Sequence, residues 1–266
     1  MTTTNLLVAI KNIVTNPITN LTAHYNSSSN RVNSEGEALE NYIKDIFCGT
    51  VNTTDENQRN QIFSQHFSYL GNQNNPPDIM IRGGDAIEVK KMESNGSGIA
   101  LNSSYPKDVL YSDSPMLTEA CKVCEAWTQK DLLYSVGVAP KGKLVSLWFV
   151  YGDCYFANRN FYQQLLNVTD PLKVTTFNFL KENSLPLIRS MALPPEQLIE
   201  KSIDTDSKFL NALMSKKRYE SFPFSDRNDL ETLKESGLLI SDFRIHSPSD
   251  PSIMIDAKFI SYQFIQ

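Results

Sequence analysis

Apolar residues recur along this chain at two spacings, one typical of helices and one typical of strands. From Ser34 to about Phe47 they return every three or four positions, which predicts a helix with one buried face. Ser34 and Glu37 form a capping box, which marks the start of that helix. From Ala86 to Lys90 apolar and polar residues alternate, which predicts a strand with one buried side.

The predicted helix carries one acidic residue, Glu40, that we expect to point inward. Glu40 lies on the line of Gly36 and Ile43, because side chains three or four positions apart share a face of a helix. Carboxylates rarely face the interior of a protein without a partner. Glu40 therefore needs a structural or functional reason for its position.

Similar patterns predict the other elements and the fold class. Two strong strands follow a helix that we expect to begin at Ser114 and Pro115. The order of helix, three strands, helix and strands predicts an α/β sandwich, a mixed sheet flanked by helices, over residues 1–157. We expect residues 158–266 to form an α+β elaboration packed on this core within one domain. The further predicted strands are 99–105, 132–139, 144–151, 239–245 and 253–264, and the further helices are 1–14, 159–166, 196–217 and 229–235.

The composition is that of a globular protein able to bury one sizeable core, with 266 residues of which 41% are hydrophobic and 21% charged. A net charge of -5 argues against coating nucleic acid through overall charge, although it is compatible with a basic cleft. The chain has only four cysteines, no charged leader with a cleavage site and no run of membrane-spanning length. We therefore expect a soluble protein of the cytoplasm.

The most informative stretch of the chain reads as a hairpin that carries Asp78, Glu88 and Lys90. Glu88 and Lys90 share a face of the second strand, because they lie two residues apart. A two-residue Gly83–Gly84 loop would put Asp78 and Glu88 on opposite faces. A three-residue loop over 82–84, with Gly84 in the left-handed conformation, would bring both carboxylates onto one face. If the two acids act together, the hairpin must have an odd-length loop or a bulge.

These residue types at this spacing fit the metal-dependent hydrolysis of a phosphodiester. Such a reaction needs oxygen ligands that hold one or two Mg²⁺ ions and leave positions open for a phosphate oxygen and a water molecule. Asp78 and Glu88 would supply the ligands, with the carbonyl of Val89 as a further one. Lys90 would orient the water, lower its pKa or steady the phosphate, and Glu40 would add an assisting carboxylate.

Two other motifs in the chain are weaker candidates for a site. The second half of the acid-and-lysine pattern recurs at Asp256-Ala257-Lys258, but without an upstream Pro-Asp pair or a preceding acidic helix. Cys121 and Cys124 have the spacing of a zinc-binding pair, but no second pair of ligands accompanies them. We interpret both cysteines as buried residues of a helix.

Together these residues resemble the PD-(D/E)XK nuclease superfamily, whose shared core order is αβββαβ. The chain is more closely similar to the NgoPII-type group of type II restriction endonucleases, over roughly Pro17 to Ala157. The segments that carry this similarity are Asn74-Asn75-Pro76-Pro77-Asp78, Gly84-Asp85-Ala86-Ile87-Glu88-Val89-Lys90-Lys91, Leu101-Asn102-Ser103-Ser104-Tyr105-Pro106-Lys107 and Tyr151-Gly152-Asp153-Cys154. The resemblance implies a prokaryotic enzyme with a Mg²⁺ cofactor, a homodimer, a short palindromic target, GGCC in that group, and functional pairing with a cognate DNA methyltransferase.

Double-stranded DNA is the expected substrate, and a twofold homodimer would cut both strands of a palindrome with two symmetry-related sites. The loop with Asn102, Ser103, Ser104 and Lys107 offers donors to phosphates and base edges, and Lys91 is a further phosphate candidate. Two other hypotheses stay open: a repair nuclease of the same fold that recognises a DNA structure or end, and a DNA-binding module without catalysis. The intact set of two acids and a lysine argues against the last.

Overall fold

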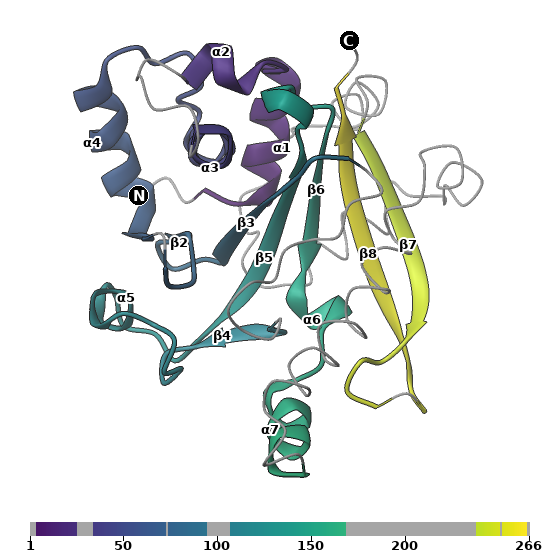
Figure 1. The fold of residues 1–266 in the computed structure, drawn as a ribbon. Coiled ribbons are helices and arrows are strands. Elements are labelled where there is room, and N and C mark those ends of the chain that lie inside the picture. Colours follow the sequence, from purple (N-terminus) through teal and green to yellow (C-terminus); the bar gives the residue numbers. More distant parts are fainter. Residues whose placement is uncertain are drawn as a thin grey trace.

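The computed structural model describes residues 4–25, 34–72, 74–94, 107–168, 238–250 and 252–264. Within them the chain forms an eight-stranded sheet with helices packed against it (Figure 1). The helical elements are α1 (Leu6–Thr15), α2 (Leu21–Tyr25), α3 (Ser34–Cys48), α4 (Glu56–His66), α5 (Glu119–Val123), η1 (Pro140–Gly142), α6 (Gly152–Tyr155) and α7 (Arg159–Val168). The strands are β1 (Phe67–Leu70), β2 (Ile79–Ile81), β3 (Ala86–Met92), β4 (Val109–Tyr111), β5 (Gln129–Val138), β6 (Ser146–Tyr151), β7 (Leu238–His246) and β8 (Met254–Gln263).

The sheet is mixed. Its strand order is β1-β2-β3-β5-β6-β8-β7, and β4 pairs with β5 beside this path. β3 and β5 run parallel, whereas the other pairs of described strands are antiparallel. A parallel pair needs a crossover connection, and here that connection contains β4 and α5. The expected fold class, a mixed sheet flanked by helices, is therefore confirmed at this level.

Each face of the sheet is covered by a different part of the chain. Helices α1 and α3 pack with Ile87 and other sheet residues in one apolar core, and Figure 1 shows them with α2 and α4 on one side of the sheet. A second core on the other face includes Ala86 together with residues of α5 and α6. Because side chains alternate along a strand, Glu88 points to the face of Ala86 and Val89 to the face of Ile87.

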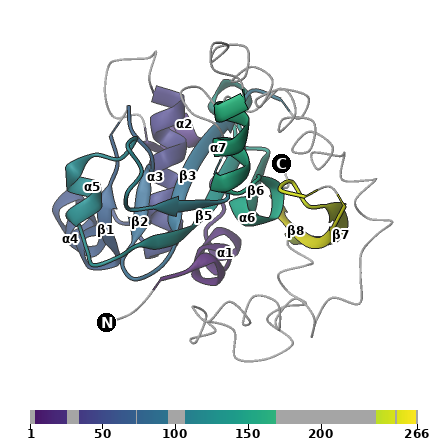
Figure 2. The ribbon, with the colours of Figure 1, turned by 90° about the horizontal axis from the view of Figure 1, so that it is seen from below.

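The C-terminal hairpin extends the sheet. β8 pairs with β6, and β7 pairs with β8 as the outer strand. Seen from below, this hairpin lies at the opposite end of the molecule from α4 and α5 (Figure 2). Asp256, from the weaker second motif, is exposed there and lies 3.6 Å from the guanidinium of Arg244. Asp256 of the second motif is therefore part of a solvated ion pair within the hairpin.

Elements with a strong apolar pattern were predicted correctly, and weakly patterned ones were not. The predicted 1–14, 34–47 and 159–166 helices correspond to α1, α3 and α7, and the predicted strands to β3, β5, β6, β7 and β8. α4 and β1 were missed, because α4 buries only Phe63 and β1 has four residues. The predicted start of the next helix was wrong: α5 begins at Glu119, since the Thr118 hydroxyl accepts from the Cys121 amide at 3.1 Å and caps it. The elements predicted at 99–105, 196–217 and 229–235 lie outside the described residues.

The two cysteines of the candidate zinc motif are packing residues. Cys121 is buried, and its Sγ lies 3.3 Å from Sδ of Met80 on the hairpin. The Sγ of Cys124 lies 3.9 Å from the same sulfur. Among the helices of the described segments, none combines the length and the apolar character that crossing a membrane requires.

Candidate active site

The hairpin of β2 and β3 has the register that the sequence predicts. Ile79 pairs with Ile87 and Met80 with Ala86, around a three-residue loop over 82–84. Continued by one residue beyond the end of β2, this register would set Asp78 opposite Glu88. Here the two segments are joined by a side-chain hydrogen bond, in which Oδ2 of Asp78 accepts from the Val89 amide at 2.6 Å. The prediction of an odd-length loop is therefore confirmed.

One detail of the loop prediction is wrong. Gly83, and not Gly84, adopts the left-handed conformation, with φ at 66°. Gly84 is needed for a different reason, because a Cβ there would lie 2.8 Å from Cγ2 of Ile81. The loop turns tightly over Ile81, whose carbonyl accepts from the Gly84 amide at 3.0 Å.

Asp78 is the electrostatic centre of the site. Burial, together with the negative charge of Glu88, raises the pKa of its carboxyl to about 7. The Val89 amide and the Lys90 ammonium lower this pKa, and the carboxylate of Glu40 raises it. The other three residues that the sequence marks as catalytic thus all act electrostatically on Asp78.

Glu88 and Lys90 share a face of β3 and form an ion pair, with Nζ 2.7 Å from Oε1. The other carboxylate oxygen, Oε2 of Glu88, is buried and has no hydrogen-bond partner among the described residues. A buried carboxylate oxygen without a donor is unfavourable unless a cation or a water molecule meets it. Within the part of the chain that the structure describes, no group donates to this oxygen.

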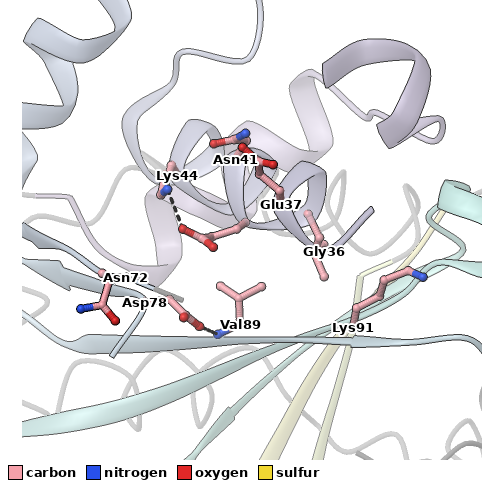
Figure 3. A pocket seen from close by; sticks show the side chains of 11 residues that line it. Gly36, Glu37, Asn41, Lys44, Asn72, Asp78, Val89 and Lys91 are labelled. Carbon is pink, nitrogen blue, oxygen red and sulfur yellow. Dashed lines mark hydrogen bonds and ion pairs between the residues drawn. The ribbon is translucent and has the colours of Figure 1, made fainter. Parts of the chain in front are cut away.

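A polar cavity of about 540 Å³ lies between α3 and the hairpin (Figure 3). Asn41 and Lys44 project into it from the helix above, and Asp78 and Val89 border it from the strands below. Glu40 also lines this cavity and forms an ion pair with Lys44 at 2.6 Å. Glu40 therefore faces the cavity that holds Asp78, as its position on the predicted helix suggests.

The donor set fits a hard divalent cation. Within the described ranges, no three His, Cys, Asp or Glu side chains already gather closely enough to hold a metal ion. Two carboxyl groups nevertheless interact there: Asp78 has a raised pKa, and Glu88 has an oxygen without a donor. A bound cation would relieve both, because its charge favours ionised carboxylates and offers the missing partner. The Val89 carbonyl belongs to the same stretch of β3.

Lys107, a predicted DNA contact, lies at the face of Glu88. Burial lowers the pKa of its ammonium, which also interacts with the charges of Glu88 and Lys90. Its backbone is held by the hydroxyl of Tyr134, which accepts from the Lys107 amide at 3.0 Å and donates to its carbonyl at 3.3 Å. The other predicted contacts of this loop, Asn102, Ser103 and Ser104, lie outside the described residues.

Lys91, the second predicted phosphate contact, faces away from Lys90 towards α3. Its ammonium forms ion pairs with Glu35 of α3 and with Glu93. Burial lowers the pKa of Lys91, but the hydrogen bonds to these carboxylates raise it above its ordinary value. A phosphate would therefore have to displace carboxylates from Lys91.

Gly71 is a residue of the site that sequence reasoning did not find. Its amide donates to the carbonyl of Asp78 at 2.7 Å, which continues the pairing of β1 with β2. A Cβ at this position would lie 2.5 Å from the carbonyl oxygen of Pro77 and 2.8 Å from Cα of Asp78. Glycine is thus required because two backbones meet here, and a lone glycine in a polar segment gives no sequence signal for such a contact.

The close approach at Gly71 gives a testable expectation. Gly71→Ala is expected to displace Asp78, to lower the free energy of unfolding by about 2 kcal/mol or more and to reduce activity. Gly36→Ala is the matched control, because a Cβ there meets nothing within 4 Å on α3, and alanine favours helices over glycine by up to about 1 kcal/mol. Urea unfolding of both variants measures the difference. A Gly71→Ala protein as stable as the parent would contradict the contact.

The chain matches known proteins over nearly all of its length. The family model described as NgoPII restriction endonuclease matches residues 4–190. The protein named Type II restriction enzyme NgoPII, from Neisseria gonorrhoeae, is 37% identical over 283 residues, which cover 97% of this chain and 99% of that protein. No solved structure matches the chain. The similarity thus extends beyond residue 157, whereas the sequence segments that carry the resemblance described above all lie before it.

Proposed function

This chain belongs to the NgoPII restriction endonuclease family and is a site-specific deoxyribonuclease, and from that premise we propose that it cleaves DNA at a Mg²⁺ site built on Asp78 and Glu88. The observation that carries the proposal is the hairpin register. Continued by one residue past Ile79, that register would set these two acids opposite each other, and Lys90 lies beside Glu88. Two opposed carboxylates with an adjacent ammonium suit a divalent cation and an anionic phosphate together.

The order of elements supports a PD-(D/E)XK core. α3 is followed by β1, β2 and β3, then by α5 and β5, and β3 lies parallel to β5. This reproduces the αβββαβ order of the superfamily when α4 and β4 are taken as insertions. Under this proposal residues 1–157 carry catalysis, and the C-terminal strands extend the sheet of the same domain.

Each residue of the site has a role that its surroundings support. Asp78 and Glu88, with the Val89 carbonyl, would hold the metal, because the Asp78 pKa and the unpartnered Glu88 oxygen both fit a nearby cation. Bound there, Mg²⁺ would polarise a phosphate oxygen and lower the pKa of a water molecule. Lys90 forms an ion pair with Glu88, and its ammonium would stabilise the charge that develops on the phosphate. Glu40 would assist from the opposite wall of the cavity.

Substrate binding would use local positive charge, because the whole chain carries a net charge of -5. Lys107 would contact the phosphate nearest the reaction, and Lys91 would contact a neighbouring phosphate after leaving its carboxylates. Asn102, Ser103 and Ser104 would add donors from the loop that precedes Lys107.

We extend the proposal to the biological unit and the target. A homodimer with twofold symmetry would cut both strands of a palindrome, GGCC in the group that the sequence resembles. The enzyme would act in the cytoplasm of a prokaryote. A cognate DNA methyltransferase would protect the host's own sites.

Digestion of unmethylated plasmid DNA tests the proposal. With Mg²⁺, the protein is expected to give discrete fragments whose sequenced ends share one short palindrome. A chelator should abolish cleavage, and methylation of GGCC should block it if that sequence is the target. Ends that follow DNA structures or free termini would favour a repair nuclease, and binding without cleavage across divalent metals would favour a non-catalytic module.

Lys107→Met is expected to weaken DNA binding and to slow cleavage. One phosphate contact should be lost, so the slope of log affinity against log salt should fall by about 1. Lys143→Met, which removes an exposed lysine far along the chain from the site, is the control for net charge. Fluorescence anisotropy over a salt series measures both variants. An unchanged salt slope for Lys107→Met would remove Lys107 from the DNA contact.

A further inference from the structure

A buried ion pair holds the loop of the catalytic hairpin. Lys130 at the start of β5 is 3% exposed, and its ammonium is paired with the carboxylate of Glu125. The same ammonium donates to the carbonyls of Ile81 (3.0 Å) and Gly84 (2.7 Å), one at each end of the loop. All three protons of the Lys130 ammonium thus have an acceptor.

Glu125 also binds the loop directly, through a hydrogen bond to its backbone. Its second carboxylate oxygen accepts from the amide of Gly83 at 3.0 Å, the residue with the left-handed conformation. Burial opposes ionisation of Glu125, but hydrogen bonds from Lys130, Gly83 and Ser68 hold its pKa below the ordinary value. Glu125 is therefore a carboxylate that binds both the loop backbone and Lys130.

The loop needs such a constraint because its own sequence also permits a different register. A Gly-Gly pair is among the preferred two-residue hairpin loops. That loop would pair Asp78 with Val89 and turn Asp78 away from Glu88. It would also move the Ile81 and Gly84 carbonyls and the Gly83 amide, so that Lys130 and Glu125 would keep each other as partners but lose their hydrogen bonds to the loop. Losing hydrogen bonds at largely buried charges is unfavourable.

We propose that the Glu125–Lys130 pair is a positioning device that selects the three-residue loop and thereby sets Asp78 opposite Glu88. Neither residue touches the reacting groups. Both act through the loop backbone, and β5, which carries Lys130, is also the parallel neighbour of β3, so the pair ties the hairpin to the rest of the sheet. A buried polar pair that fixes register is the best-attested use of such groups. The inference rests on the proposed function for its catalytic consequence, although the register itself can be measured without it.

The test compares two double variants of the full chain. The clamp variant, Glu125→Gln with Lys130→Met, removes the pair without leaving an unpaired buried charge. Glu119→Gln with Lys122→Met is the matched control, because it removes an ion pair from α5 in which Glu119 is 83% exposed. The clamp variant is expected to lose at least about tenfold in kcat, with the Kd for DNA in Ca²⁺ unchanged. The control should keep the parent values of both.

The register is read by NMR. In the parent protein the α-protons of Met80 and Ala86, which face each other, should show a nuclear Overhauser contact. This contact is expected to weaken in the clamp variant and to persist in the control. A clamp variant that keeps both the contact and the parent kcat would overturn the proposal, and so would one that loses kcat while keeping the contact. If the parent itself does not cleave DNA, the proposed function fails, and the NMR comparison still decides the role of the pair.

A rescue separates positioning from general support of the fold. Deleting Arg82 from the clamp variant leaves a two-residue Gly83–Gly84 loop that pairs Ile81 with Asp85, which restores Asp78 opposite Glu88. The deletion is therefore expected to raise kcat at least about threefold above that of the clamp variant, although it removes the bonds of Arg82 to Ser64 and Phe67. A further loss of kcat would overturn the proposal. Should the clamp variant fail to fold, Glu125→Gln alone serves, with the same expected loss of the Met80–Ala86 contact.

Discussion

Lys90→Ala is expected to slow DNA cleavage by about 10³-fold or more and to leave DNA affinity within about threefold of the parent value. The reason is the position of the ammonium, 2.7 Å from Glu88 and on the same face of β3. There it would meet the negative charge that develops on the phosphate only as the reaction proceeds. A group that acts mainly in the transition state changes the rate and not the affinity.

Single-turnover cleavage in Mg²⁺, with affinity measured separately in Ca²⁺, tests this expectation for Lys90. Lys122→Ala is the control for the loss of one positive charge, because Lys122 of α5 pairs with the exposed Glu119. Circular dichroism must show that both variants fold. A Lys90→Ala enzyme that cuts within tenfold of the parent rate would exclude Lys90 from catalysis.

Asp78→Asn is expected to abolish cleavage and, in the absence of metal, to stabilise the protein at pH 8. The folded pKa of Asp78 is raised to about 7, above its ordinary value of 3.8. Between these two values the folded protein holds a proton that the unfolded chain has released, so stability falls as pH rises through this window. Above pH 7 the full cost of the buried charge is present, on the order of 2–4 kcal/mol. Asparagine cannot ionise and avoids that cost.

Melting temperatures across pH, with and without Mg²⁺, test this expectation for Asp78. At pH 8 without metal, Asp78→Asn should melt several degrees above the parent, and the difference should vanish near pH 4. Mg²⁺ should raise the melting temperature of the parent more than that of the variant, because the variant has lost one of the two carboxylates proposed to hold the metal. Equal melting temperatures at pH 8 would show that Asp78 is not held in an unfavourable charged state.

Elements were predicted correctly where a single segment has a clear hydrophobic periodicity or a defined loop length. The helical spacing over 34–47 predicted α3 and the inward place of Glu40, and the parity of the loop over 82–84 predicted the opposition of Asp78 and Glu88. The strands at β5 and β6 followed from unbroken apolar runs. Each of these depends on hydrogen bonds or burial within a few neighbouring residues.

Contacts between segments far apart in the sequence could not be predicted from local patterns. β1 is short and follows the polar helix α4, so nothing in either predicts that β1 pairs with β2. Gly71 and Tyr134 matter only because they meet the backbones of Asp78 and Lys107. Lys130 reads in the sequence as the polar edge of a strand, and its buried partners come from two other parts of the chain.

The sequence by itself determined the strongly patterned elements, the catalytic residues proposed for this nuclease and the requirement that its hairpin have an odd loop. Only the tertiary structure decided how that requirement is met. A pair of glycines permits two hairpin registers of similar local free energy, because glycine can adopt the backbone conformations that either loop requires. The choice between them is made by the carboxylate and ammonium of Glu125 and Lys130, which are buried against the loop by the packing of β5 on β3.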